Sequence, residues 1–382
     1  MIKSFSAATR EIDDAQAAVA EIKTALNLEK NLLKNSLGIV SCFSEFAETG
    51  VLKAICEALP FDCIGTTSCL CSTCGEVDQI IFTITVLTSD DCDFKTTLIP
   101  ITSEYKKSIA FEISGLFEKT AEKPKLFLSY FPLINTISGD MILAEIDKAT
   151  GGIPLFGTIA VDHTMDYNTS TTILNGEIYR EAVVLGSVYG NPKFSFELAS
   201  FNEDNIRKQK GIITASEKNI LIGVNGKTAL EYLEEVGMAR EDLVKGLGLI
   251  PLIVEYKGSV KSVARAVFTV TPENNAVCGG EMPVGATVAI GRVDANDVLS
   301  TAQKAMTSFV EKNTTILAYS CVARYLALGA NSYAEAEKIS EISADNQYLF
   351  AYSGGEICPL PNDKGGLTNF FHNFTTVFCK LS

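Results

Sequence analysis

The sequence predicts an α/β protein in which mixed β-sheets are covered by helices. Amphipathic helical segments alternate with short apolar strand segments along most of the chain. Hydrophobic residues make up 47% of the composition and charged residues only 20%, which excludes a disordered chain. The length of 382 residues favours more than one domain, each with its own core.

A first run of elements covers residues 9–101. Apolar residues spaced three and four apart predict a helix over residues 9–31, and a second helix over residues 48–59 ends before Pro60. Apolar and β-branched runs predict strands at 37–43, 62–66, 79–87 and 94–101.

The same order of elements recurs over residues 104–198. Helices are expected at 104–118 and 139–149, and strands at 125–130, 153–158, 171–174, 178–188 and 194–198. Residues 39–44 align with 127–132, and residues 61–66 align with 153–158. We therefore expect an internal duplication of one α-β-α-β-β-β unit in the N-terminal part.

A charged segment at residues 202–211 marks a domain boundary, so we predict domains at residues 1–201 and 212–382. In the second domain the pattern predicts helices at 228–236, 240–245, 296–310 and 333–342. Strands are expected at 249–256, 263–270, 286–290, 315–320, 347–352 and 370–381, with a Gly/Pro-rich loop at 353–369. From residue 296 the α-β-α-β order appears again.

Charge and cysteine content restrict the partners and the compartment. The net charge is −14 and the one short basic segment is residues 207–210, which excludes nucleic acid as a partner. No run reaches the roughly 18 apolar residues of a membrane-spanning helix, and the N-terminus has no signal-peptide pattern. Eleven cysteines, an odd number, indicate free thiols in a reducing compartment. We expect a cytoplasmic protein.

Three short motifs in the C-terminal quarter hold residues suited to ligand binding. Each follows or lies on a predicted strand, so the motifs are expected to converge at the strand ends. They comprise Cys321 and Arg324, then Gly354, Gly355 and Glu356, and finally His372, Asn373 and Thr375.

These motifs resemble the FIST domain, a prokaryotic sensory module. The FIST C-terminal half has a Cys-x-x-Arg, a Gly-Glu-Ile-x-Pro and a His-Asn-x-Thr, which correspond here to residues 321–324, 355–359 and 372–375. The N-terminal FIST half resembles residues 62–68 and 154–162, where Thr158 replaces a glycine of the usual motif. The resemblance implies recognition of a small ligand, amino acids in particular, and relay to a separate partner such as a kinase or cyclase.

The motif chemistry agrees with capture of an amino acid. Arg324 can hold a carboxylate through a charge-assisted pair, and Glu356 can accept an ammonium group. Glycines at 354 and 355 let backbone approach a ligand, while Asn373 and Thr375 add neutral donors and acceptors. On this hypothesis Arg324→Ala abolishes binding and leaves the fold intact. The alternative is that Arg324 and Glu356 pair with each other or cap strand ends.

Two other functions use the same residues. In an enzyme, Cys321 would be the nucleophile of an acyl transfer, with His372 as base and Glu356 as its orienting group. In a haem-based gas sensor, His372, His163 or Cys358 would be an axial ligand. We expect neither, and no cofactor, because residue types alone do not establish a triad or a metal ligand.

A cysteine cluster at Cys63, Cys69, Cys71 and Cys74 contains one Cys-x-x-Cys. No second pair stands at zinc-finger spacing, so buried or loop thiols are the simpler interpretation. The sequence therefore predicts a non-enzymatic FIST-type sensor whose ligand lies in a cleft between the two domains.

Overall fold

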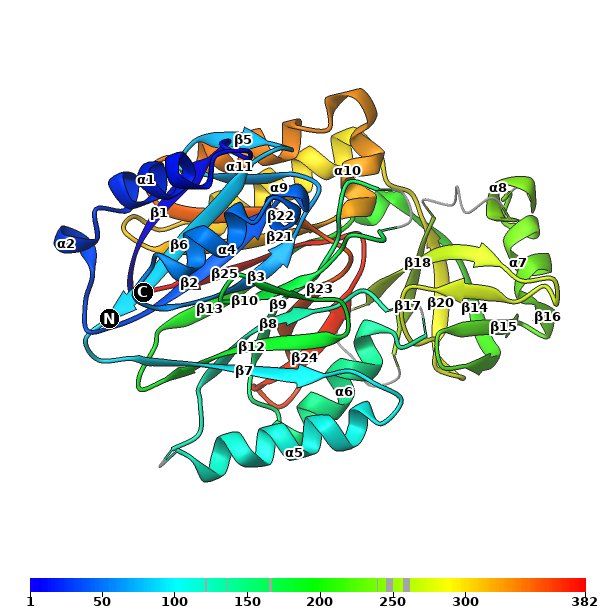
Figure 1. Ribbon diagram of the computed structural model, residues 1–382. Coiled ribbons are helices and arrows are strands. Elements are labelled where there is room, and N and C mark those ends of the chain that lie inside the picture. Colours follow the sequence, from blue (N-terminus) through cyan, green and yellow to red (C-terminus); the bar gives the residue numbers. More distant parts are fainter. Residues whose placement is uncertain (121, 135, 165–166, 239, 245–249, 257–261) are drawn as a thin grey trace.

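The computed structural model describes residues 1–382 except 121, 135, 165–166, 239, 245–249 and 257–261. Three six-stranded mixed sheets pack together and carry helices on their outer faces, and a separate barrel lies beside them (Figure 1). The α/β class with mixed sheets and covering helices is confirmed.

The first sheet is built mainly from the N-terminal unit of the chain. Its own strands are β1 (Lys3–Thr9), β2 (Asn35–Cys42), β3 (Asp62–Thr67) and β6 (Phe82–Ser89). Its helices are α1 (Ala15–Leu26), α2 (Leu28–Asn31), α3 (Glu45–Glu48) and α4 (Val51–Glu57). Strands β2 and β3 run parallel, and β6 and β1 extend the sheet antiparallel.

The second unit repeats this arrangement. Its strands are β7 (Asp93–Pro100), β8 (Leu126–Phe131), β9 (Leu155–Ile159) and β12 (Ala182–Tyr189), with helices α5 (Tyr105–Glu118) and α6 (Gly139–Thr150). Strands β8 and β9 are parallel, and β12 and β7 extend them antiparallel.

The third unit is the C-terminal part, which the sequence indicated only as a partial signature. Its strands are β13 (Phe194–Ala199), β21 (Thr315–Cys321), β22 (Gln347–Ser353) and β25 (Thr376–Leu381). Its helices are α9 (Ala295–Phe309), α10 (Val322–Leu328) and α11 (Ala334–Ile342). The predicted duplication is therefore one part of a threefold repetition, with the order β13-β25-β21-β22 matching β1-β6-β2-β3.

Each unit lends a hairpin to the sheet of another unit, which interlocks the three. The hairpins are β4 (Cys71–Thr73) with β5 (Glu76–Asp78), β10 (Thr172–Leu174) with β11 (Glu177–Tyr179), and β23 (Glu356–Pro361) with β24 (Leu367–His372). They pair with β22, β3 and β9, respectively. Strands from both sides of the predicted boundary at 202–211 thus share sheets.

The barrel is inserted between β13 and α9. Its elements are β14 (Ile206–Glu217), β15 (Ile220–Val224), β16 (Lys227–Thr228), α7 (Ala229–Glu235), α8 (Arg240–Val244), β17 (Pro251–Glu255), β18 (Val263–Val270), β19 (Ala276–Cys278) and β20 (Thr287–Gly291). Pairing of β14 with β15 closes six strands around an apolar core of their own. The helix predicted at residues 240–245 and the strand predicted at residues 249–256 lie partly outside the described residues.

The three sheets bury one shared apolar core where their inner faces meet. Leu37 and Ile39 of the first unit lie there with Leu128 of the second and Leu317 of the third. The hydroxyls of Tyr130 and Tyr319 are 3.0 Å apart across this core. Burial of apolar area on this scale is the main stabilising contribution to such a fold.

A glycine recurs where the parallel strands approach most closely. A Cβ atom on Gly65 would lie 1.8 Å from the Val40 carbonyl oxygen, and one on Gly157 would lie 1.7 Å from that of Ser129. Any larger residue would force the two strands apart. The alignment of residues 61–66 with 153–158 is therefore confirmed.

The alignment of residues 39–44 with 127–132 is wrong by one residue. The strand pairings make Val40 equivalent to Ser129, whereas that alignment matched Val40 to Leu128. Ile39 and Leu128 face the shared core and are the true equivalents. A slip of one residue moves every side chain to the other face of a strand.

Four further sequence expectations about secondary structure are corrected. Residues 3–9 form a strand, and helix α1 begins only after Asp14, whose carboxylate caps it. Strands β7 and β13 belong to the units that follow them, because they pair with β12 and β25. The predicted loop at 353–369 contains β23, and the charged segment at 202–211 leads into β14.

Candidate ligand-binding site

Cys321 is the last residue of β21 and the cap of α10. Its side chain is 3% exposed, and its backbone N–H donates to the Thr375 carbonyl oxygen at 2.9 Å. Burial raises the pKa of the Cys321 thiol well above its ordinary value, and the Glu356 carboxyl nearby raises it further. A thiol held neutral in this way is a poor nucleophile.

Arg324, one turn along α10, is fully buried and paired with Glu335 of α11. Its Nε and Nη2 atoms donate to Glu335 Oε1 at 3.0 and 2.8 Å, and Nη2 also donates to the Val298 carbonyl oxygen at 2.8 Å. Of the guanidinium nitrogens, Nη1 has no hydrogen-bond partner within the described part of the chain. The guanidinium therefore has one free arm instead of the open two-point fork that the sequence suggested.

Glu335 is the centre of a buried polar network that sequence reasoning missed. Its carboxylate accepts hydrogen bonds from the hydroxyls of Ser320, Thr376 and Tyr352 as well as from Arg324. A signal was present in the sequence: Glu335 lies four residues before Ile339, on the apolar stripe of its helix. A carboxylate in that stripe needs a buried cation.

Glu356 begins strand β23 and is also fully buried. Its Oε2 atom accepts a hydrogen bond from Thr375 Oγ1 at 2.7 Å, while no described residue bonds to Oε1. Burial raises the pKa of the Glu356 carboxyl to about 8, although the hydrogen bond from Thr375 and the charge of Arg324 counteract the rise. At neutral pH the carboxyl is therefore mostly protonated.

The two motif glycines serve packing. A Cβ on Gly355, whose φ is 155°, would lie 2.3 Å from the Phe371 ring. A Cβ on Gly354 would lie 3.1 Å from the Ala160 carbonyl oxygen. At both positions the backbone passes so close to other protein atoms that a side chain would not fit. The sequence predicted instead that these glycines expose the backbone to a ligand.

The last motif joins the site to the barrel. His372 stands opposite Glu356 in the β23–β24 pairing, and its Nε2 lies 3.1 Å from the Cys358 carbonyl oxygen. Asn373 Oδ1 accepts the backbone N–H of Ala266 in the barrel at 3.2 Å. The structure thus brings Cys321, Glu356 and Thr375 together, with Arg324 and His372 beside them.

Two family models match this chain along most of its length. The FIST N domain matches residues 36–227 and the FIST C domain matches residues 229–359. The chain belongs to the FIST family. FIST domains are small-ligand sensory modules of signalling proteins.

Comparison with solved structures and curated proteins adds no functional argument for this FIST protein. The crystal structure of a cyanuric acid hydrolase from A. caulinodans aligns over 100% of this chain and 98% of its own at 8% identity, with a TM-score of 0.38. No curated protein matches the sequence.

Thr158 departs from the FIST motif that has glycine at this place, and the structure gives it a role. Its hydroxyl donates to Ser353 Oγ at 2.7 Å. Ser353 Oγ in turn donates to the Gly355 carbonyl oxygen at 2.6 Å, which fixes the turn that leads into Glu356. Thr158 therefore supports the FIST C motif from the second unit.

The residues of the alternative functions lie in this FIST chain as follows. His372 is buried next to the Cys358 carbonyl, and exposed His163 has its ring 4.5 Å from that of Phe43. The four residues of the cysteine cluster are free thiols, of which only Cys74 is exposed. Within the described residues, no three His, Cys, Asp or Glu side chains are placed to hold a metal ion.

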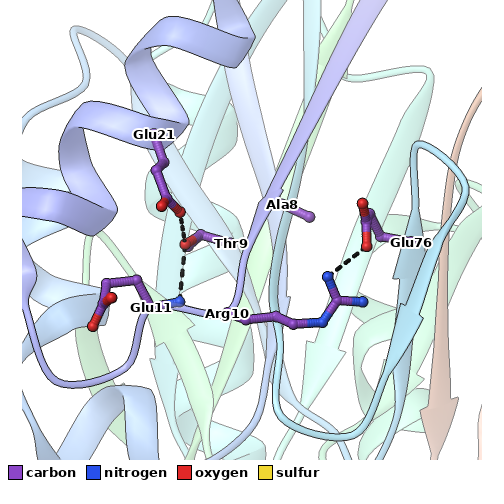
Figure 2. A pocket seen from close by; sticks show the side chains of 6 residues that line it. All are labelled: Ala8, Thr9, Arg10, Glu11, Glu21 and Glu76. Atoms are coloured by element: carbon purple, nitrogen blue, oxygen red, sulfur yellow. Dashed lines mark hydrogen bonds and ion pairs between the residues drawn. The ribbon is translucent and has the colours of Figure 1, made fainter.

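A cavity of about 420 Å³ opens elsewhere, between α1, the end of β1 and the hairpin β4–β5 (Figure 2). It is lined by Ala8, Thr9, Arg10, Glu11, Glu21 and Glu76. Figure 2 shows Thr9 bonded to Glu21 and Arg10 paired with Glu76. Each of these two contacts measures 2.5 Å. None of the FIST motif residues lines this cavity.

Proposed function

We propose that this FIST protein senses a free amino acid, bound non-covalently between Arg324 and Glu356. The observation that carries the proposal is a pair of unpartnered polar atoms of opposite character. Arg324 Nη1 and Glu356 Oε1 are both fully buried and have no hydrogen-bond partner among the residues that the structure describes. Buried polar groups without partners are rare, because each costs roughly 1–3 kcal/mol.

The two atoms belong to one electrostatic neighbourhood. The charge of Arg324 lowers the pKa of the Glu356 carboxyl. Arg324 also lowers the pKa of the Cys321 thiol, and Glu356 raises it. A carboxylate on Nη1 and an ammonium on Oε1 would satisfy both atoms at once. An α-amino acid carries these two groups on a single carbon.

Binding of an amino acid would also change the protonation of Glu356. Burial favours the neutral form of the Glu356 carboxyl, whose pKa is about 8. An ammonium group beside Oε1 favours the ionised form, so binding near neutral pH releases a proton. The affinity is then expected to rise with pH until the carboxyl is ionised without ligand.

We infer a sensory role without catalysis. The Cys321 thiol is buried and its pKa is raised, and His372 Nε2 faces a backbone carbonyl. The readout would pass to a separate signalling partner such as a kinase. All eleven cysteines are free, which supports a location in the reducing cytoplasm. No helix in the described part of the chain is long and apolar enough to cross a membrane.

Thermal unfolding of the full chain with a panel of amino acids tests the proposal. A ligand at about 100 times its Kd adds ~2.7 kcal/mol, which shifts Tm by several degrees. Glycinamide, which lacks the carboxylate, and acetate, which lacks the ammonium group, are the matched controls. Selective shifts with amino acids support two-ended recognition. Equal shifts with the controls, or no shift with any amino acid, would overturn it.

A further inference from the structure

The connection between β24 and β25 touches both the barrel and the buried site. It comprises residues 373–375, and Phe371 of β24 lies two residues before it. On the barrel side, Arg265 Nη1 donates to the Phe371 carbonyl oxygen at 2.8 Å. Ala266 N–H donates to Asn373 Oδ1 at 3.2 Å. These bonds tie the connection to strand β18.

The fit between Asn373 and the barrel is tight. A Cβ on Gly279, next to strand β19, would lie 2.3 Å from Asn373 Oδ1. Gly279 N–H donates to the Ala266 carbonyl oxygen at 2.7 Å. Ala266 therefore forms hydrogen bonds through both its N–H and its carbonyl group at this contact. Displacing Asn373 would therefore disturb β18 directly.

Phe374 is fully buried and adopts a left-handed backbone conformation, with φ of 58°. For a large non-glycine residue this conformation is a genuine outlier that the surroundings must hold in place. The surroundings are an apolar cluster that joins Cys321 to the barrel residues Ile253, Ala264, Ala266 and Ala289. Relaxation of Phe374 to an ordinary φ would withdraw its ring from the barrel.

The next residue belongs to the ligand site. Thr375 Oγ1 donates to Glu356 Oε2 at 2.7 Å, and the Thr375 carbonyl accepts the N–H of Cys321 at 2.9 Å. Three consecutive residues thus contact the barrel strand, the barrel-facing cluster and the Glu356 carboxyl, in that order. Any change in the hydrogen bonding of Glu356 reaches Phe374 through one peptide unit.

We propose that Asn373, Phe374 and Thr375 couple the charge state of Glu356 to the docking of the barrel. This inference rests on the binding site proposed above. Among the described residues, the charged and titratable groups facing Glu356 are Arg324 from α10, Cys321 at the end of β21 and His372 across the hairpin. Ionisation of Glu356 strengthens the hydrogen bond that its carboxyl accepts from the Thr375 hydroxyl. This stronger bond shifts the strained residue before Thr375, Phe374, away from its docked position on the barrel.

Hydrogen–deuterium exchange of the full chain tests the coupling with the proton itself as the probe. The readout is the protection of the Ala266 amide, compared between wild type and Glu356→Gln at the same pH. At pH 6 the two proteins should match. Between pH 8 and pH 9 the wild type should lose protection by up to about tenfold relative to Glu356→Gln.

Two substitutions of Thr375 serve as matched variants. Thr375→Val keeps the shape and removes the hydroxyl, so the pH-dependent difference should vanish. Thr375→Ser keeps the hydroxyl, so the pH-dependent difference should remain. Equal protection in wild type and Glu356→Gln at pH 9 would overturn the coupling. So would a difference that survives in Thr375→Val.

The two proposals fail in different ways. Amino acids that shift Tm without any Glu356-dependent change at Ala266 would contradict the coupling and leave the binding site standing. A Glu356-dependent change at Ala266 without any amino-acid shift would contradict the proposed ligand, and the coupling would hold.

Discussion

Arg324 Nη2 and Glu335 Oε1 lie 2.8 Å apart, and both side chains are fully buried. Removing one partner of such a pair strands the other charge in the interior, at a cost of about 3–5 kcal/mol. The sequence-based hypothesis that Arg324→Ala leaves the fold intact is not supported by this geometry.

Arg324→Met and Glu335→Gln are each expected to lower the free energy of unfolding by about 3–5 kcal/mol in urea denaturation. The double variant Arg324→Met/Glu335→Leu should recover much of that loss, because no charge is then left unpaired. Single variants within about 1 kcal/mol of wild type would show that the pair behaves like an exposed one.

The pH dependence of stability should carry a contribution from Glu356. Its pKa is raised to about 8 in the folded protein, from an ordinary value of 4.5. The folded state therefore holds a proton that the unfolded state has lost between these values. The stabilising contribution is complete below about pH 4.5 and is lost as pH rises through 8, at up to about 1.4 kcal/mol per pH unit.

The measurement is the difference in unfolding free energy between wild type and Glu356→Gln from pH 5 to pH 9. That difference should fall steadily and level off above pH 8. A difference independent of pH would mean that the carboxyl is already ionised in the folded state.

Alkylation of the native protein should modify one thiol rapidly. Cys74 is exposed and the other ten cysteines are buried. Peptide mass analysis after a short pulse of iodoacetamide should find label on Cys74 and none on Cys321. The two thiols should react alike only after unfolding. Rapid modification of native Cys321 would restore the enzyme hypothesis.

Gly157→Ala should destabilise the second unit, because the new Cβ would meet the Ser129 carbonyl oxygen. Overpacking of this kind costs about 1–3 kcal/mol or more. Gly115→Ala is the matched control: its Cβ would meet nothing, and in helix α5 the change should stabilise by about 0.5–1 kcal/mol. Equal effects in thermal unfolding would contradict the strand packing described here.

The sequence predicted the parallel strands and the main helices because these have strong local patterns. It did not predict that β7 pairs with β12 or β13 with β25, since pairing is a non-local property. Strand β23 was missed because Pro359 and Pro361 indicate a loop. The pairing of β23 with β9 involves Glu356 and Ile357 and does not reach the prolines. The N–H groups that Pro359 and Pro361 lack are therefore not required on that side of the strand.

The site was predicted in part. The motif residues Cys321, Glu356 and Thr375 do lie together, as expected for residues at adjacent strand ends. The partner of Arg324 could not be inferred from the motifs, because Glu335 lies outside them on α11. The assignment of the set to ligand binding stays a prediction.

The central claim is that an amino acid binds at Glu356. Its most direct test is thermal unfolding of wild type and Glu356→Gln side by side, with and without the amino acids of the panel, at pH 7 and pH 9. We predict a shift in wild type that is larger at pH 9 and absent in Glu356→Gln. An equal shift in both proteins would place the ligand elsewhere and contradict the account.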